Sequence, residues 1–176
     1  MRIRQLAVSS LLALTAVAAA PAIADASCSG AKRTPAAQGL RHATHATLCL
    51  LNRERARHGL SRLHLSRKLS RAARGHARAM VHQHFFAHES LNGATFDARI
   101  KRTGWTRSRR SYTLGENIGW GGGSLATPRS MVRGWMASAG HRANILAGDF
   151  SAIGIGIANG APSGGAGATY ATDFGG

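Results

Sequence analysis

The sequence is poor in cysteine and lacks several catalytic signatures, and these shortages exclude whole classes of protein. Its 176 residues include two cysteines, too few for a disulfide-dense miniprotein or a structural zinc finger. No Gly-x-x-x-x-Gly-Lys-Ser/Thr run is present, which excludes a P-loop nucleotidase. Gly-x-Ser-x-Gly and His-Glu-x-x-His are also missing. Apolar residues make up 44% of the chain, an ordinary fraction for one globular domain.

Acidic residues are also scarce, and the chain is therefore strongly cationic. Seven Asp and Glu face 23 Lys and Arg, for a net charge of +16. Such a charge attracts anionic polymers. The arginines are spread along the chain rather than clustered with aromatics, so we expect anionic cell-wall polymers or lipid head groups as partners and no specific nucleic acid. The alternative is that the basic residues have no anionic partner to bind and simply form a solvated surface. In that case the excess charge reflects a compositional bias toward arginine, which accounts for 20 of the 23 basic residues.

The N-terminus has the layout of a secretory signal peptide covering residues 1–24. Arg2 and Arg4 precede an uncharged run over 6–20, and a small-x-small site follows at Ala22-Ile23-Ala24. The alternative, a membrane anchor, needs about 20 apolar residues, and Pro21 and Asp25 end the run first. No later stretch is long and apolar enough to span a bilayer. We therefore expect a secreted mature chain with no transmembrane segment and a net charge of +14.

The two cysteines, Cys28 and Cys49, are expected to pair in that oxidising compartment. The disulfide would close a loop of about 20 residues, worth roughly 3 kcal/mol in the chain-entropy model. It would tether an N-terminal arm, residues 25–45, to the first helix. The alternative is two free thiols.

Hydrophobic periodicity predicts helices first and a hairpin last. Helices are expected over about 42–58, 67–83, 95–103 and 128–138, and strands over about 153–157 and 170–174. Glycines alternate with isoleucines in the first strand, which indicates a close neighbour on that face. This order predicts an α+β fold or a three-layer α/β/α sandwich with an antiparallel sheet. The expected core residues are Met131, Val132, Trp135, Ile153, Ile155 and Ile157.

Three residues in unusual local contexts are candidates for chemistry. His88 follows two phenylalanines at a helix end, His141 follows a Ser-Ala-Gly break, and Glu116 lies in an apolar, glycine-rich stretch. Two imidazoles and a carboxylate suit a divalent cation with an open position, Zn²⁺ above all. The alternative is that both histidines hydrogen-bond to loops and that Glu116 caps backbone amides.

Five short motifs in order carry a resemblance to a known family. They are Leu51-Asn52-Arg53-Glu54-Arg55, Phe86-Ala87-His88-Glu89-Ser90, Gly115-Glu116-Asn117-Ile118, Gly140-His141-Arg142-Ala143-Asn144-Ile145-Leu146, and the ending from Ile153-Gly154-Ile155-Gly156 to Asp173-Phe174-Gly175. The chain resembles the CAP superfamily of cysteine-rich secretory proteins, antigen 5 and pathogenesis-related 1. The branch is that of the bacterial SCP-like extracellular proteins, and the domain would span 46–176.

The resemblance implies the α/β/α sandwich and a cleft lined by two His and two acidic residues, which in some members binds a divalent cation. His88, Glu116 and His141 match three members of that tetrad. The fourth, usually a Glu shortly after the helix Trp, is replaced by Ser138. Asn117, Ser138 and Asn144 are the other expected cleft-lining residues.

Three functions are compatible with these features. The first is a secreted CAP-domain binding protein of the cell envelope or the medium. The second is a metal-dependent, protease-like hydrolase in which Glu116 is the general base. The third, DNA binding, depends on charge alone and conflicts with the signal peptide. The missing fourth acidic residue favours the first.

Overall fold

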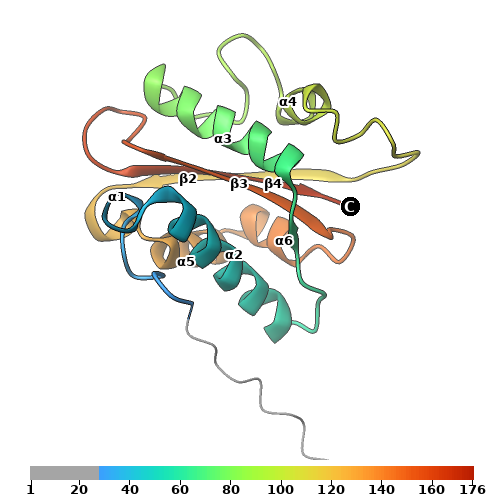
Figure 1. The fold of residues 1–176 in the computed structure, drawn as a ribbon, viewed down its shortest axis with the longest axis horizontal. Helices are drawn as coiled ribbons and strands as arrows, with labels where there is room; N and C mark the ends of the chain where they lie inside the picture. Colours follow the sequence, from blue (N-terminus) through green and yellow to red (C-terminus); the bar gives the residue numbers. More distant parts are fainter. Residues whose placement is uncertain (1–27) are drawn as a thin grey trace, which may run out of the picture.

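The protein folds as three layers, with helices on both faces of a central sheet (Figure 1). The computed structural model describes residues 28–176, so the signal peptide predicted over 1–24 lies outside the described residues. One face carries α3 (Arg67–His82) and α4 (Phe96–Arg102). The other face carries α1 (Pro35–Gln38), α2 (Leu40–Arg57), α5 (Pro128–Ala137) and α6 (Ala139–Leu146). The predicted α+β, three-layer arrangement is confirmed.

The sheet is mixed, and its order leaves two strands at the edges. Within residues 28–176 it consists of β1 (His64–Leu65), β2 (Leu114–Gly121), β3 (Ala152–Asn159) and β4 (Ala168–Gly175), in the order β1-β3-β4-β2. The three long strands are antiparallel, as expected. The two-residue β1 adds a parallel edge beside β3, and a strand so short has no alternation to reveal it. Strand β2 forms the opposite edge.

The four predicted helices agree with the observed ones to within two residues at either end, but α1, β1, β2, α6 and the 3₁₀ helix η1 (Gly123–Ala126) were not predicted. Strand β2 has glycine at three of its eight positions, and the sequence alone therefore shows no alternating pattern. Helix α6 follows Ser138, whose extended backbone separates it from α5. The sequence analysis correctly placed the end of α5 at the Ser-Ala-Gly segment, but it did not predict that α6 begins directly after Ser138.

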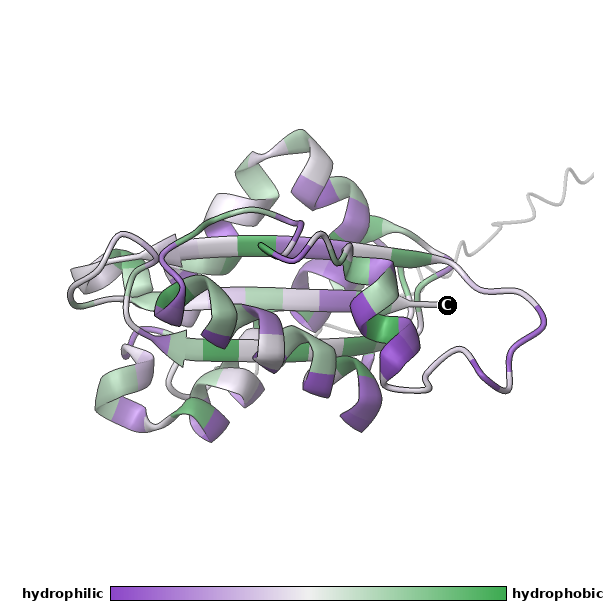
Figure 2. Cartoon of the chain, turned by 90° about the horizontal axis from the view of Figure 1, so that it is seen from above, coloured by the Kyte–Doolittle hydropathy of each residue, from purple (hydrophilic) through white to green (hydrophobic). Residues whose placement is uncertain are grey.

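Two apolar cores lie on either side of the sheet. In Figure 2 the hydrophobic residues gather on the strands and the inward helix faces, whereas the outer helix faces carry many hydrophilic ones. The core between the sheet and α2 and α5 contains all six residues expected to be buried: Met131, Val132, Trp135, Ile153, Ile155 and Ile157. On the other face, small side chains of α3 pack against Ile118 and Ala171.

Arg55, which the periodicity placed away from the apolar face of its helix, is fully buried. Its guanidinium donates hydrogen bonds to the carbonyl oxygens of Ser61, Ile145, Ala147 and Phe150, at 2.7–3.0 Å. Burial lowers the pKa of Arg55. The side chain ties α2 to the segment between α6 and β3, a contact across about 90 residues that no local pattern could reveal.

The N-terminal arm is packed against the domain. Cys28 and Cys49 form a disulfide with Cα atoms 5.7 Å apart. Thr34 caps α1 by accepting a hydrogen bond from the Ala37 amide, and the Ala31 carbonyl accepts one from the Arg129 amide on α5. The arm therefore includes a short helix that the sequence analysis did not predict.

Replacing both cysteines with serine should lower the free energy of unfolding by about 3 kcal/mol, because the disulfide restricts a loop whose ends are 21 residues apart. Chemical denaturation under non-reducing conditions measures this loss. Wild-type protein under reducing conditions is the control and should match the double variant. A double variant as stable as the oxidised wild type would contradict the prediction.

Candidate functional site

The site is organised around Glu116, which lies on the edge strand β2 with a side chain only 1% exposed. Its Oε1 accepts a hydrogen bond from Nδ1 of His88 at 2.8 Å. Its Oε2 accepts one from Nη2 of Arg99 at 2.5 Å. Both carboxylate oxygens are thus engaged by protein groups. His88, by contrast, is 54% exposed and provides the surface of this cluster.

Arg99 is a central residue of the site that the sequence analysis missed. Besides Glu116, it donates to the carbonyl oxygens of His88 and Ala94 at 2.8 Å and to Oγ of Ser90 at 3.2 Å. Its side chain is only 8% exposed. These contacts hold the loop between α3 and α4, which carries His88, against β2. In the sequence Arg99 is one of three basic residues in the last turn of α4, and nothing in the sequence distinguishes it from the other two.

The protonation of the cluster follows from these contacts. Burial alone would raise the pKa of Glu116, but the His88 hydrogen bond and the positive charge of Arg99 outweigh it and hold that pKa below its usual value. An ionised carboxylate only accepts hydrogen bonds, so the proton of the His88 ring sits on Nδ1. Nε2, on the opposite side of the ring, forms no hydrogen bond with the residues that the structure describes.

Two further buried groups, Asp173 and His76, surround Glu116 and were not predicted. Asp173 is the cross-strand neighbour of Glu116 on β4. Burial and the charge of Glu116 raise the pKa of Asp173 well above its usual value, so its carboxyl is neutral. Burial likewise lowers the pKa of His76, whose Nε2 donates to the Ala87 carbonyl. Arg99 therefore balances the single buried anion, Glu116.

His141 approaches the site from the other layer, at the start of α6. Its carbonyl accepts a hydrogen bond from Nδ2 of Asn117 at 3.0 Å. Asn144 in turn donates to the Glu116 carbonyl and to Oδ1 of Asn117. These two asparagines, expected to line the cleft, brace β2 against α6. Burial, and to a lesser extent the charge of His88, lowers the pKa of His141.

An apolar groove of about 420 Å³ lies beside His141 along the edge strand β2. Phe86, Trp120 and Leu125 line it with side chains, and their residues are 45%, 44% and 61% exposed. Leu125 belongs to a 3₁₀ helix, η1 (Gly123–Ala126), that connects β2 to α5. Ser138 and His141 form a polar margin of the groove. Ser138, which the sequence analysis placed in the cleft with His88 and Glu116, lines this groove together with His141.

A divalent cation has a limited set of donors here. In the part of the chain that the structure describes, no three His, Cys, Asp or Glu side chains are placed to hold a metal together. Glu116 is already paired with Arg99 and His88. Glu116 lies behind His88, in the place of a carboxylate that orients a metal-binding histidine without touching the metal. Within the described residues, His88, Glu116 and His141 do not form a set of three equivalent ligands.

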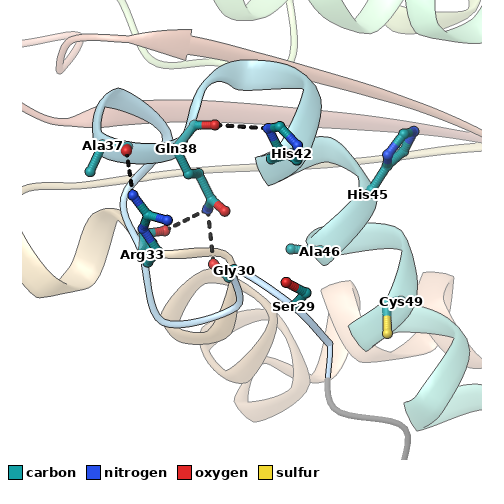
Figure 3. Close-up of a pocket in the computed structure, with 9 residues that line it drawn as sticks. All are labelled: Ser29, Gly30, Arg33, Ala37, Gln38, His42, His45, Ala46 and Cys49. Atoms are coloured by element: carbon teal, nitrogen blue, oxygen red, sulfur yellow. Dashed lines mark hydrogen bonds between the residues drawn. The ribbon is translucent and has the colours of Figure 1, made fainter.

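A larger recess of about 660 Å³ lies elsewhere, where the N-terminal arm meets α2 (Figure 3). Gln38 shapes it by donating from Nε2 to the carbonyl oxygens of Gly30 and Arg33. His42 donates from Nδ1 to the Gln38 carbonyl. This recess shares no residue with the groove beside His141. The larger of the two cavities is therefore not the one that adjoins the predicted site residues.

The fold and the Glu116–His88 cluster define an SCP-type domain, and comparison with known proteins gives its family. The family model described as "Cysteine-rich secretory protein family" matches residues 48–172. The chain therefore belongs to the CAP family of cysteine-rich secretory proteins. It is 39% identical over 108 residues to the uncharacterized protein YkwD of Bacillus subtilis, covering 61% of this chain and 39% of that protein.

Other relatives agree on the fold and differ in what surrounds it. The uncharacterized membrane protein YlbC of Bacillus subtilis is 29% identical, with 62% of this chain and 30% of that protein covered. This chain thus spans well under half the length of either curated relative. In the described residues, no helix is long and apolar enough to cross a membrane.

Two solved structures share the fold at low sequence identity. An extracellular protein with an SCP domain from Bacillus anthracis is 24% identical, with a TM-score of 0.61 and 76% of this chain and 42% of that chain covered. An outer surface protein from Borrelia burgdorferi is 18% identical, with a TM-score of 0.63 and 77% and 92% covered. At these identities the likeness establishes the architecture alone.

Proposed function

We propose that this chain is an extracellular binding protein that holds an amphipathic lipid in the groove beside His141. The observation that carries the proposal is the grouping of exposed apolar side chains. Among residues 28–176, three of the six exposed large hydrophobic residues line this one groove. Exposed apolar side chains cost free energy in water, and their concentration in a concave surface is typical of a binding site.

The margins of the groove explain why the ligand would be amphipathic. The walls are formed by Phe86, Trp120 and Leu125, and the floor by Met131 and Trp135. Ser138 and His141 provide hydrogen-bonding groups at one margin, and half-exposed His88 stands nearby. An acyl chain would occupy the apolar walls, with the polar head group at the histidines. Secretion, as predicted from residues 1–24, would place the protein at the envelope, where such ligands occur.

Trp120 provides a direct test of lipid binding. Trp105 and Trp135 are only 3% and 2% exposed, whereas Trp120 is 44% exposed. Titration with lysophosphatidylcholine below its critical micelle concentration should therefore shift the tryptophan emission to the blue, and Trp120→Phe should abolish the shift. Leu125→Asp should weaken binding of the lipid by about tenfold or more, because it places a charge against the acyl chain of the ligand.

Leu91→Asp is the matched control, since Leu91 is 66% exposed and lies outside the groove. It should leave the affinity within a factor of two or so. Equal losses in both variants, or an unchanged affinity in Leu125→Asp, would show that the groove does not hold the lipid.

We also propose that the same site binds a divalent cation weakly, through His88 and His141. Nε2 of His88 is available because Nδ1 is the ring nitrogen that donates to Glu116, and this arrangement suits Zn²⁺. Calorimetry with Zn²⁺ should show binding near neutral pH that fades toward about pH 5, where protons compete for imidazole nitrogens. His88→Ala or His141→Ala should abolish it. Glu116→Gln should weaken it by about tenfold or more.

The control for the cation is the double variant His82→Ala with His84→Ala, which removes two histidines outside the cluster. This variant should bind Zn²⁺ like the wild type. If it loses the ion while His141→Ala keeps it, the ion is held by surface histidines and the proposal is wrong.

Hydrolysis with Glu116 as general base is supported less well by the geometry. The Glu116 side chain is 1% exposed and both its oxygens are engaged, so an attacking water would have to displace His88 or Arg99. Turnover of a peptide library that stops on chelation would nevertheless favour this alternative over binding alone.

A further inference from the structure

A second polar site lies at the β1 edge of the sheet. Glu116 is on β2, which forms the opposite edge. A trough of about 330 Å³ is bounded there by Thr44 of α2, by β1 and by the first turns of α3. Three arginines of α3, Arg67, Arg71 and Arg74, line it at helical spacing. Positions i, i+4 and i+7 share one face of a helix, so the three guanidinium groups border the same trough.

These arginines have no anionic partner in the part of the chain that the structure describes. No ion pair or side-chain hydrogen bond is formed by Arg67, Arg71 or Arg74, and all three are exposed. The acidic residues that pair with cations do so elsewhere: Glu54 with Arg57, Asp97 with Lys101, and Glu116 with Arg99. The trough is therefore an uncompensated concentration of positive charge.

The placement of these charges conflicts with the local rules of helix stability. Arg67 and Lys68 occupy the first turn of α3, which contains no acidic residue. Cations there are opposed by the positive end of the helix dipole, whereas a bound anion would be stabilised by it. A sequence that breaks a local rule commonly does so at a functional position.

Ser70 adds a hydroxyl group to the trough. The residue is only 7% exposed and lines the trough, and its hydroxyl forms no hydrogen bond within residues 28–176. The hydroxyl is not among the buried side-chain atoms that lack a partner, so it reaches the open space of the trough and can donate to a ligand. Ser66, at the N-cap of α3, accepts the Leu69 amide through Oγ and keeps its own hydroxyl proton free to donate. Two hydroxyl donors and three guanidinium groups match the acceptor oxygens of phosphate.

We propose that the trough binds a linear polymer carrying repeated phosphate groups. The 1.5 Å rise per helical residue puts the Cα atoms of Arg67 and Arg74 about 10 Å apart, more than one phosphate group spans. Successive phosphates along a chain would therefore contact different arginines. The trough shares no residue with the groove proposed to bind lipid. Binding of a phosphate polymer in the trough would therefore not depend on binding of a lipid in the groove.

Long-chain inorganic polyphosphate is the probe, and calorimetry at about 0.15 M salt measures its affinity. The triple variant Arg67→Gln, Arg71→Gln, Arg74→Gln should lose about tenfold or more in affinity. The control triple variant Arg110→Gln, Arg129→Gln, Arg133→Gln removes the same charge from exposed positions outside the trough and should retain the wild-type affinity within about twofold. Circular dichroism should show both variants folded, because every substituted side chain is exposed.

Further measurements separate a phosphate polymer from other anions. Polyglutamate of matched charge should bind more weakly than polyphosphate, and amide resonances of Ser66 and Ser70 should shift on titration with polyphosphate. Equal losses in the two triple variants, absence of binding by the wild type, or equal affinity for polyglutamate would overturn the proposal. So would a trough variant that loses binding to phosphatidylglycerol vesicles but keeps polyphosphate, because the ligand would then be a bilayer.

Discussion

Gly156→Ala should unfold or severely destabilise the protein, with a loss of about 3 kcal/mol or more in the free energy of unfolding. Gly156 lies on β3 directly beneath α3. A Cβ atom at this position would sit 2.2 Å from the carbonyl carbon of Ala73 and 2.3 Å from its oxygen. Both are backbone atoms of the helix, so no side-chain rotation relieves the clash. The helix would have to move away from the sheet and open the core beside it.

Gly75→Ala is the matched control, because the same substitution falls on the outer side of the same helix. A Cβ there meets nothing within 4 Å. Alanine is a better helix former than glycine, so this variant should gain about 0.5–1 kcal/mol. Urea denaturation of both variants measures the two effects. If Gly156→Ala loses less than about 1 kcal/mol, α3 does not pack on β3 as closely as the structure places it.

Trp135→Ala should lower the free energy of unfolding by about 3–5 kcal/mol. The residue is 2% exposed in the core between α5 and the sheet. Its ring meets Tyr170 edge-on at 6.3 Å between centroids, and its Nε1 donates to the Ile118 carbonyl at 2.9 Å. Truncation would leave a cavity and also an unpaired buried carbonyl, and these two costs add.

Trp120→Ala serves as the comparison for Trp135, since it removes an indole that is 44% exposed in the groove beside His141. This substitution should cost about 1 kcal/mol or less. Denaturation followed by far-ultraviolet circular dichroism avoids any dependence on tryptophan emission. Comparable losses in the two variants would mean that α5 presents a different face to the sheet.

Arg99 sets the electrostatic character of the cluster around Glu116. An internal guanidinium already neutralises Glu116 from within the protein, so the cluster needs no external cation to balance its charge. The same side chain holds the His88 loop. The consequence is a preformed, half-exposed imidazole at the surface of the cluster.

The sequence by itself determined the elements that have a local signature. Isoleucine alternation identified β3, and the alternate glycines of that strand correctly indicated a close neighbour. Ser66 and Thr127 cap α3 and α5 through side-chain hydrogen bonds to amides only three positions further along the chain. The motifs around His88, Glu116 and His141 indicated the family, and the family model matches over residues 48–172. These signals are local because helix and strand periods, caps and glycine contacts depend on adjacent residues.

The tertiary structure decided which charges meet. Arg99 pairs with Glu116 across 17 positions, Arg55 binds carbonyls across about 90, and Asp173 faces Glu116 through the register of β2 and β4. Strand β2 itself is a strand because it pairs with β4, since its glycine-rich sequence has no alternating pattern. A buried charge is stable only where folding supplies its partners. Which partners a buried charge finds depends on which distant segments come together in the fold. A periodic pattern along the chain cannot predict those contacts.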